Sequence, residues 1–164
     1  MRLTVPAVAP DKANSVVVVE SAEEIAADKT RLLLPTVESD LLRVFDAELR
    51  GKSLRFGAGK TRDAYVENWS KQNDFVAWPV RLNDPATFEA SIVYDADSDS
   101  AGGSYILKIG PQTLPGTVKK GQNLRVPLGQ VRLEPGTFDI QVVPAKIQGA
   151  ELMRLRSVIL TPSK

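Results

Sequence analysis

The sequence predicts an all-β domain, an antiparallel jelly-roll β-sandwich, and three observations lead to this prediction. From about Leu54 onward the chain consists of short segments rich in Val, Ile, Phe and Tyr, the residues that favour strands. Turn-forming residues separate the segments, and none of the intervening stretches has the spacing of an amphipathic helix. In two segments the apolar residues also recur at every second position, the period of a strand with one buried face. The residues that share a face are Phe88, Ala90, Ile92 and Tyr94 in one strand and Phe138, Ile140 and Val142 in another.

Seven or more strands are expected in this region, and the clearest are, in order, LRF, DFVAWPVRL, TFEASIVYD, SYILKIG, LRVPLGQVRL, TFDIQVVP and LRSVILTP. Trp78 shares its phase with Val76, Val80 and Leu82, which predicts a place in the core. Glycine and proline are strong turn signals, because glycine allows unusual backbone angles and proline lacks the backbone N–H that a strand would donate. The predicted turns are Asn83-Asp84-Pro85, Gly102-Gly103, Pro115-Gly116 and Pro135-Gly136.

The N-terminal third is less regular. Val16–Val19 is a β-branched run, which predicts a buried strand. Ser21 and Glu24 have the spacing of a capping box, which predicts one or two helical turns. The segment from Leu32 to Leu34 is a short strand stopped by proline. In LLRVFDAELRG the apolar residues fit a helix, whereas the glycine and the strand-like sequence beyond it favour sheet, so both alternatives stay open.

Composition excludes several functional classes. The chain has no histidine and no cysteine, so it lacks imidazole bases, thiolate nucleophiles and the commonest metal ligands. Its 21 basic and 20 acidic residues leave a net charge of +1, which gives no electrostatic reason to expect nucleic acid or an anionic membrane as a partner. Asp63, Glu67 and Asp74 are close in sequence, yet we interpret them as solvated loop acids rather than a catalytic pair. We therefore predict no catalytic residues and no cofactor.

The stretch DADSDSAGGS, from Asp95, begins like a calcium-binding EF-hand loop with acids at alternate positions. The rest of that motif is missing, because Ser100 occupies the glycine position and Ile106 the position of the bidentate glutamate. The flanking segments are predicted strands rather than helices. We expect a polar hairpin that turns at Gly102-Gly103, and no metal site; a structural calcium held in another geometry stays an open alternative without a recognisable motif.

The order of the strand and turn segments along the chain matches that of a known type of module. AWPVRL, TFEASIVYD, GGSYILKIG, GPQTLPGTV, PLGQVRLEPGTFDIQV and LRSVILTP together resemble the galactose-binding-like β-sandwich modules attached to bacterial secreted glycoside hydrolases. The first residues, LTVPAVAPDKANSVVVVE, are similar to the last two strands of the β-sandwich that follows the catalytic barrel in α-L-fucosidases of glycoside hydrolase family 29. The resemblance implies that residues 1–30 are terminal strands and a linker from a preceding β-domain. Residues 31–164 then form the galactose-binding-like module.

This resemblance implies a non-catalytic, carbohydrate-binding-like module of a secreted or periplasmic α-L-fucosidase-type enzyme, whose catalytic residues lie on a barrel that this chain does not contain. Its partners would be a glycan, which the fucosidase parent suggests is fucosylated, and its own catalytic domain. Two alternatives stay open. In the first, the module is purely structural and packs on the catalytic domain. In the second, it is the appended module of another secreted hydrolase such as a sulfatase.

The densest aromatic stretch, DAYVENWSKQNDFVAW, supplies the candidate sugar site. Sugar-binding surfaces combine an aromatic face for the C–H side of the ring with amides and carboxylates for the hydroxyls. Trp69 has two open roles, as a stacking platform for a ligand or as a side chain packed beneath the loops. The predicted site residues are Tyr65, Asn68, Trp69, Asn73 and Asp74.

Overall fold

A computed structural model describes Val8, Asp11, Val16, Val18, Glu20, Ala22 and residues 28–36 and 38–163. The predicted strand over Val16–Val19 and the predicted helical turns from Ser21 fall largely on residues outside this described part. The division between residues 1–30 and 31–164 therefore stays a prediction. The first described strand begins at Arg31.

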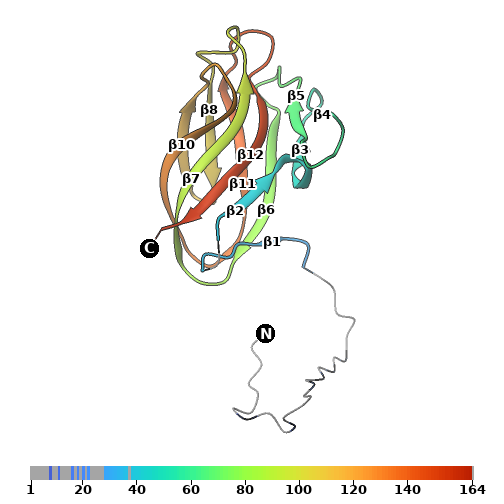
Figure 1. Ribbon diagram of the computed structural model, residues 1–164, viewed down its shortest axis with the longest axis vertical. Helices are drawn as coiled ribbons and strands as arrows, with labels where there is room; N and C mark the ends of the chain where they lie inside the picture. Colours follow the sequence, from blue (N-terminus) through green and yellow to red (C-terminus); the bar gives the residue numbers. More distant parts are fainter. Residues whose placement is uncertain are drawn as a thin grey trace.

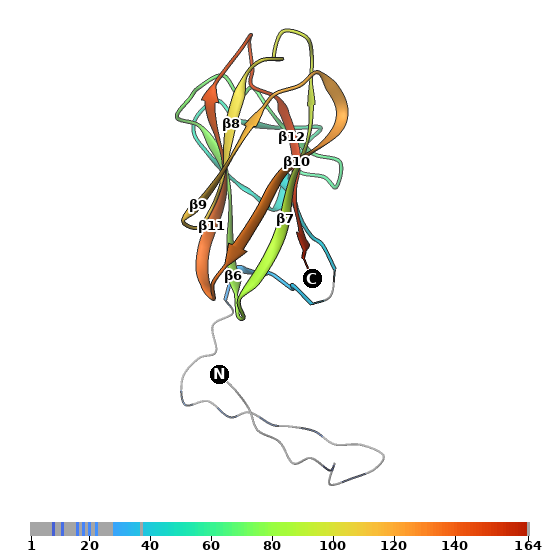
Figure 2. The ribbon, with the colours of Figure 1, turned by 90° about the vertical axis from the view of Figure 1, so that its left-hand side faces the viewer.

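The chain forms two six-stranded sheets that pack face to face, and Figure 2 shows these two layers edge-on. We call them sheet A, in the order β1-β6-β11-β8-β9 with β3 also beside β6, and sheet B, in the order β10-β7-β12-β5-β4 with β2 also beside β12. Sheet A comprises β1 (Arg31–Leu32), β3 (Glu48–Arg50), β6 (Phe75–Leu82), β8 (Ser104–Ile109), β9 (Gln112–Thr117) and β11 (Gly136–Lys146). Sheet B comprises β2 (Asp40–Arg43), β4 (Arg55–Gly57), β5 (Tyr65–Glu67), β7 (Ala86–Ala96), β10 (Gly121–Leu133) and β12 (Arg154–Pro162).

All strand pairs are antiparallel except β1 with β6. The predicted all-β, jelly-roll sandwich is thereby confirmed. Its core lies between the sheets, where the alternating residues of β6, β7 and β11 meet. Trp78 is buried as predicted, and its indole Nε1 donates to the carbonyl of Arg43 over 2.8 Å. The predicted inward face of β7 is also buried, at Phe88, Ala90, Ile92 and Tyr94.

The ambiguous segment LLRVFDAELRG is resolved in favour of sheet. It forms β2, a short 3-10 turn η1 (Val44–Asp46) and then β3. β2 pairs with β12 in sheet B, whereas β3 pairs with β6 in sheet A. The apparent helical spacing thus arises because the chain changes sheets in the middle of the segment, which places apolar side chains into the core from both sides.

The predicted hairpin at DADSDSAGGS is wrong. β7 pairs with β10 and β12 in sheet B, while β8 pairs with β11 and β9 in sheet A. The loop between them therefore crosses from one sheet to the other instead of joining paired neighbours. Both flanking segments are strands, as the sequence predicts, and Gly102 has a φ of 89°, a left-handed angle that favours glycine.

The predicted turn at Pro115-Gly116 is also wrong, because both residues lie within β9. Proline cannot donate to a neighbouring strand, but β9 forms the edge of sheet A and needs no partner on its outer side. Gly116 is opposite Tyr105 in the register, and a Cβ atom there would lie 2.3 Å from Tyr105 Cζ. The glycine leaves the space that the buried tyrosine ring fills.

Several loops meet at one end of the sandwich. The β7–β8 and β11–β12 connections lie at the upper end in Figure 1, and the C-terminus and β1 lie at the lower end. Backbone hydrogen bonds join the upper loops, including Leu152 N to the carbonyl of Trp69 over 2.9 Å and Val118 N to the carbonyl of Gly103 over 2.8 Å. This end therefore presents polar loop side chains on a rigid base.

Candidate functional site

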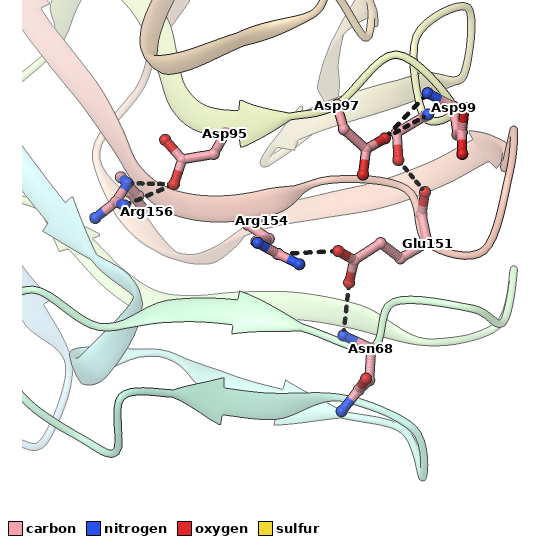
Figure 3. Close-up of polar contacts among 8 residues, drawn as sticks. Asn68, Asp95, Asp97, Asp99, Glu151, Arg154 and Arg156 are labelled. Carbon is pink, nitrogen blue, oxygen red and sulfur yellow. Dashed lines mark hydrogen bonds and ion pairs between the residues drawn. The ribbon is translucent and has the colours of Figure 1, made fainter.

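Glu151, in the β11–β12 loop, connects three loops at this end of the sandwich. One carboxylate oxygen accepts a hydrogen bond from Arg154 Nε over 3.0 Å, and the other accepts from the backbone N–H of Asn68 over 2.9 Å. The carbonyl of Glu151 accepts from the Ser100 hydroxyl over 2.9 Å. Figure 3 shows Glu151 between Asn68, from the β5–β6 loop, and Arg154, at the start of β12. The three loops are thus held in one arrangement by a single side chain and its backbone.

The acidic loop after β7 is organised by Asp97. Its Oδ1 atom accepts from the backbone N–H groups of Asp99 over 3.1 Å and Ser100 over 3.0 Å (Figure 3), the pattern of an Asx turn. The N–H of Ser100 is the main cause that holds the pKa of Asp97 below its ordinary value. Gly149, from the neighbouring loop, approaches so closely that a Cβ atom would lie 2.7 Å from the carbonyl oxygen of Asp99. This fixes the position of the acidic loop against the β11–β12 loop.

A groove of about 390 Å³ lies beside these contacts, within the size range of small-ligand sites. A second hollow of about 320 Å³ shares Glu151 and Arg154 with the groove, and Asn68, Ser70 and Asp99 help to line it. We call the two together the loop-end groove. Its first part is lined by carboxylate, amide, ammonium and guanidinium groups together with one thioether, including Asp97, Lys120, Gln122, Glu151, Met153 and Arg154.

Asp95 forms the wall where the groove meets sheet B. Burial opposes its ionisation, but hydrogen bonds from Arg156 and Asn123 lower the pKa of Asp95 below its ordinary value. Asp95 Oδ2 lies 2.6 Å from Arg156 Nη2, and Oδ1 accepts from Asn123 N over 2.5 Å. Figure 3 shows Arg156 on the side of Asp95 away from Glu151. Asp95 is thus a structural anchor rather than a free ligand group.

Trp69, the predicted stacking residue, is completely buried. Its indole Nε1 donates to the carbonyl of Asp74 over 2.8 Å, and its own carbonyl accepts from Leu152. Since neither ring face reaches solvent, the structure supports packing beneath the loops, the second of the two roles left open by the sequence. Stacking of a sugar on Trp69 does not fit this arrangement.

Asp74, another predicted site residue, is also buried. Its Oδ2 atom accepts from both the backbone N–H, over 2.9 Å, and the hydroxyl of Ser53, over 2.5 Å. Its carboxyl group also fills the space beside Gly51, where a Cβ atom would lie 2.2 Å from Asp74 Cγ. The carboxylate therefore holds the loop after β3 in place, and it is not available to a ligand in this arrangement.

These contacts predict a pH-dependent stability. Burial opposes ionisation of Asp74, yet the hydrogen bonds from Ser53 lower its pKa in the folded protein below the ordinary value for an aspartate. Stabilisation by this carboxylate is therefore fully present above about pH 4 and is lost as the pH falls through the lower folded value. We expect Asp74→Asn to be about 1–3 kcal/mol less stable than the wild type at pH 7, and the difference to shrink toward pH 2. Urea unfolding at both pH values measures this; a difference that does not change with pH would contradict it.

The remaining predicted residues are divided between two places. Asn68 is exposed, has a left-handed φ of 60°, and helps to line the loop-end groove. Tyr65 is half-buried on the outer face of sheet B, where the guanidinium carbons of Arg154 and Arg156 lie 5.9 Å and 5.5 Å from its ring centroid. Asn73 is exposed and makes no side-chain hydrogen bond to any residue in the described part of the chain. The structure thus brings Asn68 and Tyr65 near Arg154, but not Asn73.

Sequence reasoning missed the residues that build the groove. Glu151 lies in a loop and Arg154 at the start of β12, and neither belongs to a motif; Lys120 and Gln122 appear in the sequence only as part of a small basic cluster. The acidic stretch from Asp95 does stand out in the sequence, but it predicts a polar hairpin rather than the wall of a groove. Among the described residues, no three carboxylates lie close enough together to hold a metal ion. The described part also has no helix with the length and hydropathy of a membrane span.

Solved structures share this fold at low sequence identity. The structure superposes on a β-(1,4)-mannanase described as GH26-CBM35 from Podospora anserina with a TM-score of 0.61 and 20% identity, over 77% of this chain and 28% of that chain. It superposes on the C-terminal family 6 carbohydrate-binding module of LamC, a laminarinase from Zobellia galactanivorans, with a TM-score of 0.56 and 12% identity, over 75% of this chain and 98% of that chain. The fold is that of carbohydrate-binding modules.

The same fold also occurs outside carbohydrate-active enzymes. The Cry4Aa toxin from Bacillus thuringiensis matches with a TM-score of 0.66 and 11% identity, over 84% of this chain and 25% of that chain. The chain thus spans about a quarter of the length of the mannanase and of the toxin. No protein-family model and no curated protein matches the sequence. At these identities the similarity shows the fold, and function has to be argued from the site.

Proposed function

We propose that this chain is a non-catalytic carbohydrate-binding accessory module that holds a glycan in the loop-end groove. The fold shared with carbohydrate-binding modules supports this proposal. So does the position of the groove, which is built from loops on a rigid sandwich, the usual arrangement for a binding site on such a scaffold.

The observation that carries the proposal is the polar group formed by Glu151, Arg154 and Asn68 at the junction of the two hollows. A sugar hydroxyl both donates and accepts, so it needs a neighbouring acceptor and a neighbouring donor. The carboxylate of Glu151 and the guanidinium of Arg154, 3.0 Å apart, provide this combination. Ala96 adds apolar lining for the C–H groups of a ring, above the buried side chain of Met153. The groups already bonded to one another are pre-organised, which lowers the entropy lost on binding.

Arg154→Ala tests this proposal. The substitution removes a charged donor from the groove while leaving the core untouched, because Arg154 is exposed at the start of β12. A hydrogen bond to a charged group contributes about 1.5–3 kcal/mol, so we expect the affinity for the best glycan ligand to fall roughly tenfold or more. The ligand is first selected from a panel of fucosylated, plant and mucin glycans. Calorimetric titration then measures its affinity for both proteins.

Arg50→Ala is the matched control. Arg50 is also an exposed arginine in an ion pair with a nearby glutamate, Glu48, but it lies on sheet A, away from the loop-end groove. Its removal is expected to change glycan affinity less than twofold. Equal losses in both variants would contradict a specific role for the groove, and a wild-type chain that binds none of the glycans would favour the purely structural module.

The parent enzyme is a finer part of this proposal. The resemblance of LTVPAVAPDKANSVVVVE to α-L-fucosidases of glycoside hydrolase family 29 supports a secreted or periplasmic fucosidase as the parent and a fucosylated glycan as the ligand. Under this proposal the module packs next to its own catalytic domain. The fucosylated glycans of the panel test the proposed ligand. The proposed parent is tested by the full-length gene product, which should contain a catalytic barrel of glycoside hydrolase family 29.

A further inference from the structure

The outer face of sheet B carries a second group of polar side chains, separate from the loop-end groove. In the strand register Arg43 of β2 is opposite Ser157 of β12, Ser157 is opposite Val93 of β7, and Val93 is opposite Arg125 of β10. The two arginines therefore lie at the ends of one row that crosses four strands. At about 4.8 Å per strand spacing, their backbones are roughly 14 Å apart.

Both arginines lack an acidic partner, unlike Arg154 and Arg156 on the same face. Arg154 and Arg156 form ion pairs with Glu151 and Asp95, but neither Arg43 nor Arg125 forms an ion pair with any residue of the described part of the chain. Arg125 is held by one hydrogen bond, from its Nε to the hydroxyl of buried Ser91 over 3.0 Å. This leaves the terminal nitrogens of its guanidinium group free to bind a ligand.

A shallow hollow of about 520 Å³ lies between the two arginines. Leu41 and Ile159 form its apolar floor, and Arg31 and Ser39 lie on its rim with Glu38 and Asp46. Arg31 is 3.5 Å from Asp40 and 4.0 Å from Asp46, so its charge is matched by acids of its own. Arg43 and Arg125 remain as the cations without an ion pair, while Glu38 and the second acid beside Arg31 keep the net charge of the hollow near zero. The two open guanidinium groups, rather than an excess of positive charge, are the groups available to an anionic ligand with an apolar side.

An aromatic side chain extends this surface. Tyr65 lies beside Arg156, whose guanidinium carbon is 5.5 Å from the ring centroid. The ring also lies directly against the backbone of β4, because a Cβ atom on Gly57 would be 2.1 Å from Tyr65 Cε2. Tyr65 is thus fixed on the outer face by contacts on both sides while part of its surface stays accessible. Because both sides of the ring are in contact with the protein, Tyr65 borders this surface and does not offer a free face for a sugar to stack on.

We propose that the outer face of sheet B binds sulfated polysaccharides. Arg43 and Arg125 contact sulfate groups, and Leu41 and Ile159 contact the apolar sides of the sugar rings. A sulfate group accepts hydrogen bonds from many directions, so it can bind two arginines that are oriented differently. A carboxylate is planar and binds best to a guanidinium group that lies in the same plane. A single partly exposed tyrosine is too little for single-stranded nucleic acid, which needs successive aromatic rings for its bases.

The test is the binding of dextran sulfate and of neutral dextran, which share one backbone. We expect the wild-type chain to bind dextran sulfate with an affinity that falls between about 50 and 200 mM NaCl, and not to bind dextran. The double variant Arg43→Gln/Arg125→Gln is expected to lose tenfold or more in affinity for dextran sulfate. The control Arg50→Gln/Lys108→Gln removes two positive charges from the outer face of sheet A and is expected to lose less than threefold. Circular dichroism shows whether each variant is folded.

Several outcomes would overturn the proposal: no binding of dextran sulfate, equal losses in the two double variants, equally tight binding of polygalacturonate, or tighter binding of an oligonucleotide of matched charge. If Arg43→Gln/Arg125→Gln unfolds, the variant Arg43→Lys/Arg125→Lys is used instead, because it keeps both charges and removes only the guanidinium groups. An unchanged affinity of this variant for dextran sulfate would show that charge alone causes binding, and it would overturn the assignment of sulfate binding to the two guanidinium groups. Binding of neutral glycans is measured separately, so failure here is distinguishable from failure of the loop-end groove.

Discussion

Trp69→Ala is expected to destabilise the domain by about 3–5 kcal/mol, the usual effect of removing a buried tryptophan side chain. Trp69 is fully buried, and its indole donates to the carbonyl of Asp74 over 2.8 Å. The substitution leaves a cavity beneath the loops and a buried carbonyl without its donor, and both effects lower the free energy of unfolding. Urea unfolding followed by circular dichroism measures the change directly.

Two further variants separate packing from ligand contact at this position. Trp69→Phe keeps an apolar ring but loses the hydrogen bond to Asp74, so we expect a smaller loss of about 1–3 kcal/mol. Asn73→Ala changes an exposed neighbour in the same loop and is expected to alter stability by less than about 0.5 kcal/mol. If Trp69→Phe instead weakened glycan binding strongly while leaving stability unchanged, the packing role would be wrong.

Gly116→Ala is expected to destabilise the domain by about 2–3 kcal/mol, although it adds only a methyl group. The new Cβ atom would lie 2.3 Å from Tyr105 Cζ and 2.6 Å from Tyr105 Oη. Tyr105 is fully buried and packs edge-on against Tyr94 with 6.2 Å between ring centroids, so its ring cannot move without displacing other core residues. Thermal or urea unfolding of the purified variant tests this.

A double-mutant cycle identifies the cause. Tyr105→Leu shortens the side chain that occupies the space beside Gly116, so Gly116→Ala should be much less destabilising in that background. Thr113→Ala is the control in the same strand, since Thr113 is exposed on the outer side of β9. A full loss from Gly116→Ala in the Tyr105→Leu background would show that the glycine is required for another reason, such as backbone conformation.

Strand content and the core were the parts of this fold that sequence predicted well. The period of two places Phe88, Ile92 and Tyr94 on one face, and the structure buries them. Such local alternation is sufficient because each strand has one face toward the other sheet. Connections were predicted less well: the loop after β7 crosses between sheets, and Pro115-Gly116 lies within an edge strand. Turn residues mark where a chain can bend, but they do not say which strands it joins.

The candidate site shows the same limit. The aromatic and amide chemistry of residues 65–74 was the clearest signal in the sequence, yet Trp69 and Asp74 are used to hold loops together. Glu151 and Arg154 carry no motif, and they become a candidate site only because the β11–β12 loop folds against Asn68 and Ser100. Those contacts join residues 51 and 83 positions apart in sequence.

By itself, therefore, the sequence determined an all-β sandwich with a tryptophan-containing core and the absence of histidine and cysteine chemistry. The tertiary structure alone decided which polar residues share a surface: the Glu151–Arg154 groove at the loop end, and the Arg43–Arg125 row across sheet B. The physical reason is that burial follows the alternation within one strand, whereas a binding surface is assembled from side chains of different strands, whose order in the sheets is set by long-range packing.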